Sequence, residues 1–186
     1  MVSVTEMLNS PRFPFGLRSL LVVSAVALLA GCASPAPKPD ATTTSLAQLM
    51  VQRLAIADQV AWVKYQNGAP VLDPVREKQV MDRVVSEATA AGIDPQLAAR
   101  FFEAQMRASR IRQQELITKW SQGALLPTWG PLSLKDDIRP VLDQITIDLI
   151  NELKGFPDSA SSRRSLAKAL SDAGYGRSVV RAATRF

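Results

Sequence analysis

Two basic side chains in one amphipathic segment are the first candidates for binding an anion. Arg53 and Lys64 are eleven residues apart, so at about 100° per residue they fall on the same face of a helix. The residues between them on that face are small, namely Ala57, Val60 and Ala61. A long cation on an amphipathic helix usually extends to solvent. Two cations that flank a small-residue patch can also lean over one ligand lying between them.

Further polar residues interrupt apolar helix faces or gather near a helix start. Ser109 and Gln113 are four apart, hence on one face, within a stripe that is otherwise apolar. Buried polar groups need partners, so both have a structural as well as a functional interpretation. The remaining candidates are Asp73, Arg76, Glu77 and Arg139. Asp73 by itself is better explained as a helix cap. Taken together, the set predicts a polar pocket for a small polyanion in a helical bundle.

The composition excludes several classes of chemistry. The chain has 186 residues, a formal net charge of +5, no histidine and one cysteine. Without histidine, no Ser-His-Asp or Cys-His relay and no His-ligated zinc site can form. One cysteine cannot make a Cys₄ metal site, a redox pair or an internal disulfide. We therefore expect no metal site, and any chemistry must use carboxylates, amides, hydroxyls and basic side chains. The charge is mixed and lacks a basic block with interleaved aromatic residues, so we expect no nucleic-acid partner.

Residues 1–31 are predicted to be a lipoprotein signal peptide. Two arginines precede an uncharged apolar run of 11 residues, Leu20 to Ala30, which is about half of the ~20 residues that a spanning helix needs. The sequence Leu29-Ala30-Gly31-Cys32 resembles a bacterial lipobox, in which Cys32 becomes the lipidated first residue. An ordinary cleaved signal is the alternative. Ala33 after the cysteine is typical of outer-membrane sorting, so we expect a periplasmic domain that contacts the membrane only through its lipid anchor.

The mature chain is predicted to consist of a short tether followed by one all-α domain. Residues 32–44 are rich in proline and threonine and are expected to be extended. Apolar residues then recur at spacings of three and four, without any alternating β pattern. About six helices are expected, over residues 45–66, 74–91, 95–120, 133–154, 159–174 and 176–184. Within the domain 45–186, residues 45–153 would hold the site and residues 154–186 would form a supporting layer.

Caps mark most of the predicted helix starts. Asp73-Pro74 and Asp94-Pro95 each combine an N-cap with proline at the first helical position. Ser133 with Asp136 three residues later is typical of a capping box. Asp158-Ser159 could cap the fifth helix.

The polar set resembles the all-helical AroQ-class chorismate mutases, specifically the exported gamma subclass. The resemblance covers about Leu46 to Trp120 and continues weakly to about Ile150. Its motifs are Arg53 in QRLAIAD, Lys64 in WVKYQ, Asp73, Arg76 and Glu77 in LDPVRE, and Ser109 and Gln113 in FFEAQMRASRIRQ. It implies a cofactor-free Claisen rearrangement of chorismate to prephenate, a step in phenylalanine and tyrosine biosynthesis. Such a reaction requires neither histidine nor a second cysteine.

The resemblance also implies a role for each matched position. Arg53 would grip a substrate carboxylate, and Lys64 would contact a carboxylate and the ether oxygen. Gln113 would donate to the ether oxygen from the other side. Some relatives carry glutamate there, which must be protonated to donate. Glutamine needs no such proton, so activity should persist at neutral pH.

The remaining matched positions would hold the other substrate groups. Ser109 would hydrogen-bond a carboxylate, and Arg76 would add positive charge near the carboxylate and the ether oxygen. Glu77, with the backbone near Asp73, would hold the ring hydroxyl.

The last arginine of the pocket is the least constrained assignment. In exported relatives it comes from a later helix of the same chain, for which Arg139 is the candidate and Arg112 the substitute. Pro140 follows Arg139 directly, so the helix either starts nearer Asp136 or kinks there. Exported relatives are often dimers, which makes a homodimer possible here. The alternative function is a non-catalytic helical envelope lipoprotein that binds a small organic anion.

Overall fold

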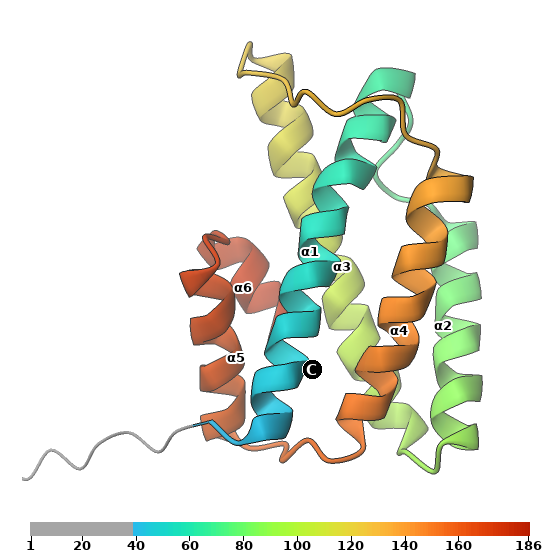
Figure 1. Ribbon diagram of the computed structural model, residues 1–186, viewed down its shortest axis with the longest axis vertical. Helices are drawn as coiled ribbons and strands as arrows, with labels where there is room; N and C mark the ends of the chain where they lie inside the picture. The colour runs from blue at the N-terminus through green and yellow to red at the C-terminus, as the bar shows by residue number, and fades with distance from the viewer. Residues whose placement is uncertain (1–38) are drawn as a thin grey trace, which may run out of the picture. The chain divides into compact units, whose positions relative to one another are not determined.

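The computed structural model describes residues 39–186, and this part of the chain is helical throughout apart from its connecting loops (Figure 1). Its elements are α1 (Ala41–Asn67), α2 (Pro74–Ala90), α3 (Pro95–Ser121), the π-helical turn η1 (Leu134–Ile138), α4 (Arg139–Leu153), α5 (Ala160–Asp172) and α6 (Arg177–Ala183). The all-α prediction is confirmed. The predicted signal peptide and Cys32 lie outside the described residues. Among the described helices, none is both long and apolar enough to cross a membrane.

Helix α1 begins earlier than its sequence indicates. It starts at Ala41 rather than at Ser45, so residues 41–44 are not part of an extended tether as predicted. Asp40 caps the helix, because its carboxylate accepts hydrogen bonds from the backbone N–H and the hydroxyl of Thr43, both at 2.8 Å. The run of β-branched threonines has low helix propensity, and the cap together with the burial of Thr43 outweighs that preference.

The next two helices start as their caps predict. The Asp73 side chain accepts a hydrogen bond from the backbone N–H of Arg76 at 3.0 Å, with Pro74 at the first helical position. Asp94 accepts from the backbone N–H of Gln96 at 2.9 Å in the same way. These two caps fix the direction in which α2 and α3 leave their loops.

The entry to α4 contains a turn that the sequence only partly indicates. Ser133 Oγ accepts from the backbone N–H of Asp136 at 3.1 Å, as a capping box requires, but Asp137 rather than Asp136 accepts from the Ser133 N–H, at 2.7 Å. The turn then widens to a π-helix, in which the Arg139 N–H bonds to the Leu134 carbonyl. Pro140 has no N–H to complete an α-helical turn, and the wider turn places this proline at the start of α4.

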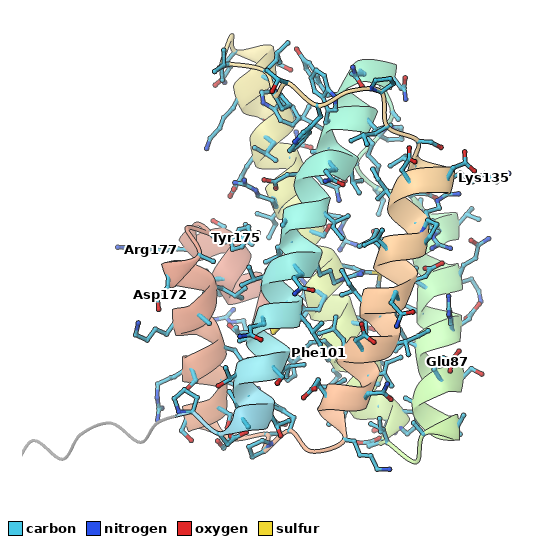
Figure 2. All side chains as sticks on the ribbon, in the orientation of Figure 1. Glu87, Phe101, Lys135, Asp172, Tyr175 and Arg177 are labelled. Atoms are coloured by element: carbon cyan, nitrogen blue, oxygen red, sulfur yellow. The ribbon has the colours of Figure 1, made fainter. Side chains whose placement is uncertain are left out.

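The hydrophobic core forms around α1, which packs against α3, α4 and α5. In Figure 1, α1 lies between α5 on one side and α4 on the other. Fully buried side chains from these helices fill the centre, among them Leu46, Met50, Leu54, Phe101, Phe102, Leu149 and Leu166. Figure 2 shows Phe101 directed inward, whereas Glu87 and Lys135 project outward. This segregation is the amphipathic pattern expected of packed helices.

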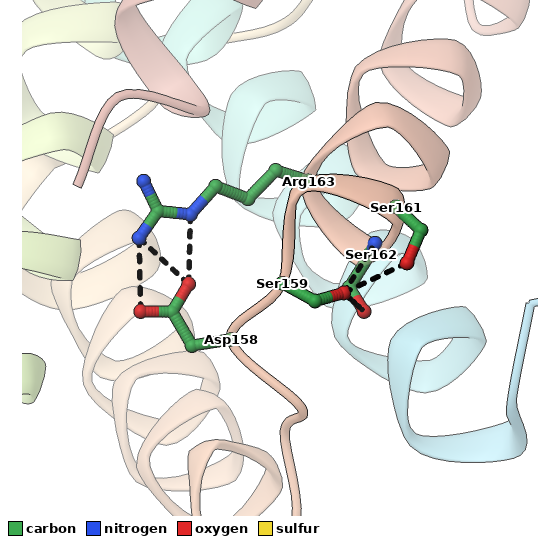
Figure 3. A network of polar contacts seen from close by, with 5 residues as sticks. All are labelled: Asp158, Ser159, Ser161, Ser162 and Arg163. Atoms are coloured by element: carbon green, nitrogen blue, oxygen red, sulfur yellow. Dashed lines mark hydrogen bonds and ion pairs between the residues drawn. The ribbon is translucent and has the colours of Figure 1, made fainter.

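The C-terminal helices α5 and α6 pack against α1 and α3. Leu166 and Leu170 of α5 are fully buried. Gln105 of α3 donates from Nε2 to the Ala183 carbonyl of α6 at 2.9 Å. At the start of α5, Ser159 accepts from the backbone N–H of Ser162 at 3.1 Å, and a bidentate ion pair joins the neighbouring Asp158 and Arg163 (Figure 3). The cap of α5 is therefore Ser159 rather than Asp158.

Candidate active site

A cavity of about 130 Å³ opens between α1, α2, α3 and the η1–α4 segment. All eight predicted substrate-binding residues line it, namely Arg53, Lys64, Asp73, Arg76, Glu77, Ser109, Gln113 and Arg139. They come from four separate parts of the chain. The fold therefore brings together the whole set that the sequence singled out, in one place.

Helix α1 supplies two buried cations and the small residues between them. Arg53 is 7% exposed and Lys64 is 9% exposed. Ala57 and Val60 line the cavity between them, as predicted, but Ala61 does not. Ala61 lies about 80° around the helix from Arg53 at 100° per residue, and it packs among buried tryptophans instead.

The guanidinium of Arg53 is buried without full hydrogen bonding. Its Nε has no hydrogen-bond partner among the described residues, and its Cζ lies 5.8 Å from the centre of the Phe102 ring. Burial lowers the pKa of Arg53 to about 10, and the positive charge of Arg76 acts in the same direction, while Asp143 opposes them. Arg53 is still a cation at neutral pH. A buried, under-satisfied cation is a strong binding group for an anion.

Lys64 is held at the opposite end of the same helix face. Its Nζ donates to the Val71 carbonyl at 2.5 Å, and an ammonium has three N–H donors, so two remain for a ligand. Burial lowers the pKa of Lys64, and the negative charges of Asp73 and Glu77 partly offset this effect. The bond to Val71 anchors the α1–α2 loop against the cavity.

Helix α3 supplies a neutral amide. Gln113 is 5% exposed, and its Nε2 donates to Ser109 Oγ at 2.9 Å. The second N–H of this amide is left for a ligand. The Gln113 Oε1 is buried with no partner among the described residues. An unpaired buried amide oxygen is costly, and it marks this wall of the cavity as one that a ligand or water completes.

The start of α2 places three polar groups at the rim. Asp73 both caps the helix and lines the cavity. Arg76 Nη2 donates to Asp143 Oδ1 of α4 at 2.8 Å, and Glu77 Oε2 accepts from Arg110 Nη1 of α3 at 2.5 Å. Each of these two side chains is thus tied to a different neighbouring helix.

Of the two candidates for the last arginine of the pocket, Arg139 lines the cavity and Arg112 does not. Arg139 is the first residue of α4 and lines the cavity. Arg112 instead makes a bidentate ion pair with Asp58, with both N···O distances at 2.6 Å, and lies over the Tyr175 ring. The hydrogen bonds that Arg112 donates to Asp58 raise the pKa of Arg112 despite its partial burial.

Two charged residues of the cavity were not predicted from the sequence. Asp143 and Arg110 both line it. Asp143 is four residues after Arg139, and Arg110 adjoins Ser109. Each forms an ion pair with a residue on another helix, which the sequence alone does not reveal. The described lining contains five cations and three carboxylates, a net charge of +2. An excess of two positive charges in a partly buried cavity fits a small dianion.

Comparison with known families agrees with this geometry. The family model for chorismate mutase type II matches residues 40–114. A secreted chorismate mutase of Mycolicibacterium smegmatis is 33% identical over 138 residues, covering 72% of this chain and 75% of the relative. One of Mycobacterium tuberculosis is 28% identical over 117 residues, covering 61% of this chain and 58% of the relative.

Solved structures give the same result. A chorismate mutase from Burkholderia thailandensis superimposes with a TM-score of 0.67 and 32% identity, covering 77% of this chain and 95% of the other. The secreted chorismate mutase of Yersinia pestis shares the fold, with a TM-score of 0.64, 20% identity, and coverage of 75% and 92% of the two chains. From its sequence relatives, its fold and its charged cavity, the chain belongs to the chorismate mutase type II family.

Proposed function

We propose that this protein converts chorismate to prephenate in the cavity between α1, α2, α3 and α4. The observation that carries the proposal is the convergence of all eight predicted residues on one cavity with a net charge of +2. Chorismate carries two carboxylates. In its concerted rearrangement a C–O ether bond breaks while a C–C bond forms, and no proton is transferred. Catalysis then consists of holding a compact conformer and stabilising the negative charge that grows on the ether oxygen.

The buried cations of α1 would bind the substrate's charged ends. Arg53 presents a planar fork suited to a carboxylate, and its unpaired Nε supports such a ligand. Lys64 has two free N–H donors, one for a carboxylate and one for the ether oxygen. Because both groups are desolvated, their interaction with an anion is stronger than at the surface.

The other walls would complete the substrate's contacts. Gln113 would donate its second N–H to the ether oxygen, opposite Lys64. Ser109 would hydrogen-bond a carboxylate, and Glu77 with the backbone at Asp73 would accept from the ring hydroxyl. Arg76 and Arg139 would add positive charge around the same carboxylate and ether oxygen.

We further propose that the domain acts outside the cytoplasm, as an outer-membrane lipoprotein of the exported gamma subclass. The similarity to secreted chorismate mutases supports an extracytoplasmic location. The finer assignment rests on the lipobox around Cys32. Fractionating cells that express the wild-type protein or Cys32→Ser tests it. The wild type should sediment with outer membranes and the variant should be soluble, whereas identical distributions would refute lipid anchoring.

The activity is tested by following chorismate loss and prephenate formation with a soluble fragment that retains Asp40, the cap of α1. Arg53→Ala and Lys64→Ala should each lower kcat/KM by about 100-fold or more, with a circular dichroism spectrum like that of the wild type. Lys78→Ala is a matched control, because Lys78 pairs only with the exposed Asp82 among the described residues. A folded wild-type fragment that binds chorismate without converting it would identify a non-catalytic binding protein instead.

A further inference from the structure

The first turn of α2 lines the cavity but has no buried side chain of its own. Among the residues of α2, only Val84 and Ala88 are buried, and both lie in its second half. Arg76 and Glu77 lie in the first turn and line the cavity. Val75 of this turn is exposed, and the partly buried Val80 and Met81 pack against the core one turn later. The positions of Arg76 and Glu77 therefore depend largely on polar contacts with neighbouring helices.

Asp143 of α4 makes the contact that holds Arg76, whereas Arg110 of α3 holds Glu77. The Asp143 Oδ1 accepts from Arg76 Nη2 at 2.8 Å, and its Oδ2 lies 3.5 Å from Arg83 Nη1. Arg76 and Arg83 are seven residues apart, which is two turns along one face of α2. The Asp143 carboxylate of α4 therefore contacts two arginines that are two turns apart on α2. Of these two arginines, only Arg76 lines the cavity.

We propose that Asp143 is a positioning residue for the rearrangement, acting through Arg76. It holds one N–H edge of the Arg76 guanidinium against α4 and leaves the remaining N–H groups of that side chain for the substrate. An arginine fixed in advance loses less rotamer freedom when the substrate binds, and its charge stays where the transition state needs it. This inference rests on the proposed chorismate mutase function.

A purely structural bridge would behave differently from a positioning one. If Asp143 only joined α4 to α2, its removal would reduce thermal stability and leave kcat unchanged. If it only offset positive charge, its removal would tighten binding of a dianion and lower KM without lowering kcat. A positioning role predicts that kcat falls while KM does not rise, because the cavity gains net positive charge but loses the fixed geometry of Arg76.

The test is steady-state kinetics with chorismate on the full-length chain. Asp143→Ala should lower kcat at least ten-fold without raising KM, and Asp143→Asn, which keeps an acceptor for Arg76, should recover most of that loss. The double variant Asp143→Ala, Arg76→Ala should be no slower than Arg76→Ala alone. Asp148→Ala is the matched control, because Asp148 is on the same helix and contacts Gln144 instead. It should stay within two-fold of the wild type.

The outcomes separate the inference from the function on which it rests. An active wild type with kcat unchanged in Asp143→Ala, or with losses that multiply in the double variant, overturns the positioning role alone. So does an Asp143→Asn variant as slow as Asp143→Ala while both retain the wild-type melting temperature. A folded wild type that neither converts nor binds chorismate, by calorimetry, overturns the proposed function and this inference with it.

Discussion

Gln113 offers a permanent donor in a buried place. It is neutral at any pH, and its Nε2 already points one N–H at Ser109. A glutamate in its position would be surrounded by little water, and as a carboxylate it would repel the negative charge that develops on the ether oxygen. The choice of amide over carboxyl therefore determines the pH range in which the proposed reaction runs.

Gln113→Glu tests this choice. The variant should lose most of its kcat/KM at neutral pH and regain activity as the pH falls and the carboxyl becomes protonated. The wild type should show no such acid-side gain. The measurement is kcat/KM between about pH 4.5 and 8, with circular dichroism at each end. Equal pH profiles for the two proteins would mean that Gln113 does not face the ether oxygen.

The alkaline limit should be set by the two buried cations of α1, namely Arg53, whose pKa burial lowers to about 10, and Lys64. Burial lowers the pKa of Lys64 below the ordinary 10.5, so the free enzyme loses this cation at a lower pH than an exposed lysine would. We expect kcat/KM to fall on the alkaline side below pH 10.5. A bound dianion favours the charged ammonium and raises its pKa, so kcat should fall only at higher pH. Lys78→Ala should leave the alkaline falls of both kcat and kcat/KM in place. A fall in kcat at the same pH as the fall in kcat/KM, or at a lower pH, would contradict the role assigned to Lys64.

For single residues, the sequence predicted correctly which side chains come together where spacing within one helix is enough to determine it. Arg53 and Lys64 share a face because eleven residues make about three turns, and the cavity confirms their convergence. The roles of Asp143 and Arg110 could not be seen, because their partners are on other helices and depend on how those helices pack. Arg112 illustrates the same limit, since its Asp58 partner excludes it from the cavity.

At the scale of the helices, the N-caps could be predicted from the sequence. The outcome could not be predicted where local preferences compete. The Asp-Pro starts of α2 and α3 are as expected. The start of α1 was missed because a proline- and threonine-rich stretch suggests an extended chain, whereas Asp40 caps it. Pro140 correctly indicated an irregular entry to α4, but the choice of a π turn depends on the packing of Ile138 against α1.

Helix α5 provides a test of the supporting layer. No described residue beyond Thr146 lines the cavity, so a lost cap there should affect stability rather than catalysis. Ser159→Ala removes the hydroxyl that caps α5 (Figure 3) and should lower the free energy of unfolding by about 1 kcal/mol with kcat/KM unchanged. Among the described residues, the exposed hydroxyl of Ser161 contacts only Ser159. Ser161→Ala should therefore change the free energy of unfolding by less than about 0.5 kcal/mol. Urea unfolding of both variants measures this, and a fall in kcat/KM for Ser159→Ala would give the layer a catalytic role.

In the molecule as a whole, one chain supplies every charged group of the cavity. Arg139 of α4 is one of these charged residues. We therefore expect that association into a homodimer is not needed to complete the proposed site. The activity of each chain should then be independent of its association state.

Dilution tests this independence. The rate per chain should stay constant between nanomolar and micromolar protein, while sedimentation velocity reports the mass over the same range. A variant such as Arg139→Ala should be slow at every concentration, because a second chain does not replace the missing side chain. A rate per chain that falls on dilution in step with dissociation would show that the site spans two chains.

If the proposed function holds, the buried cations of α1 should also link the lifetime of the protein to its substrate supply. With the cavity empty, Arg53 has an unpaired buried Nε, and no ligand offsets the desolvation of its charge. A ligand that binds only the folded state adds stability with its concentration, about 2.7 kcal/mol at one hundred times its dissociation constant. A cell compartment that lacks chorismate would thus hold the protein at its lowest stability, and proteases would remove it fastest where it has nothing to convert.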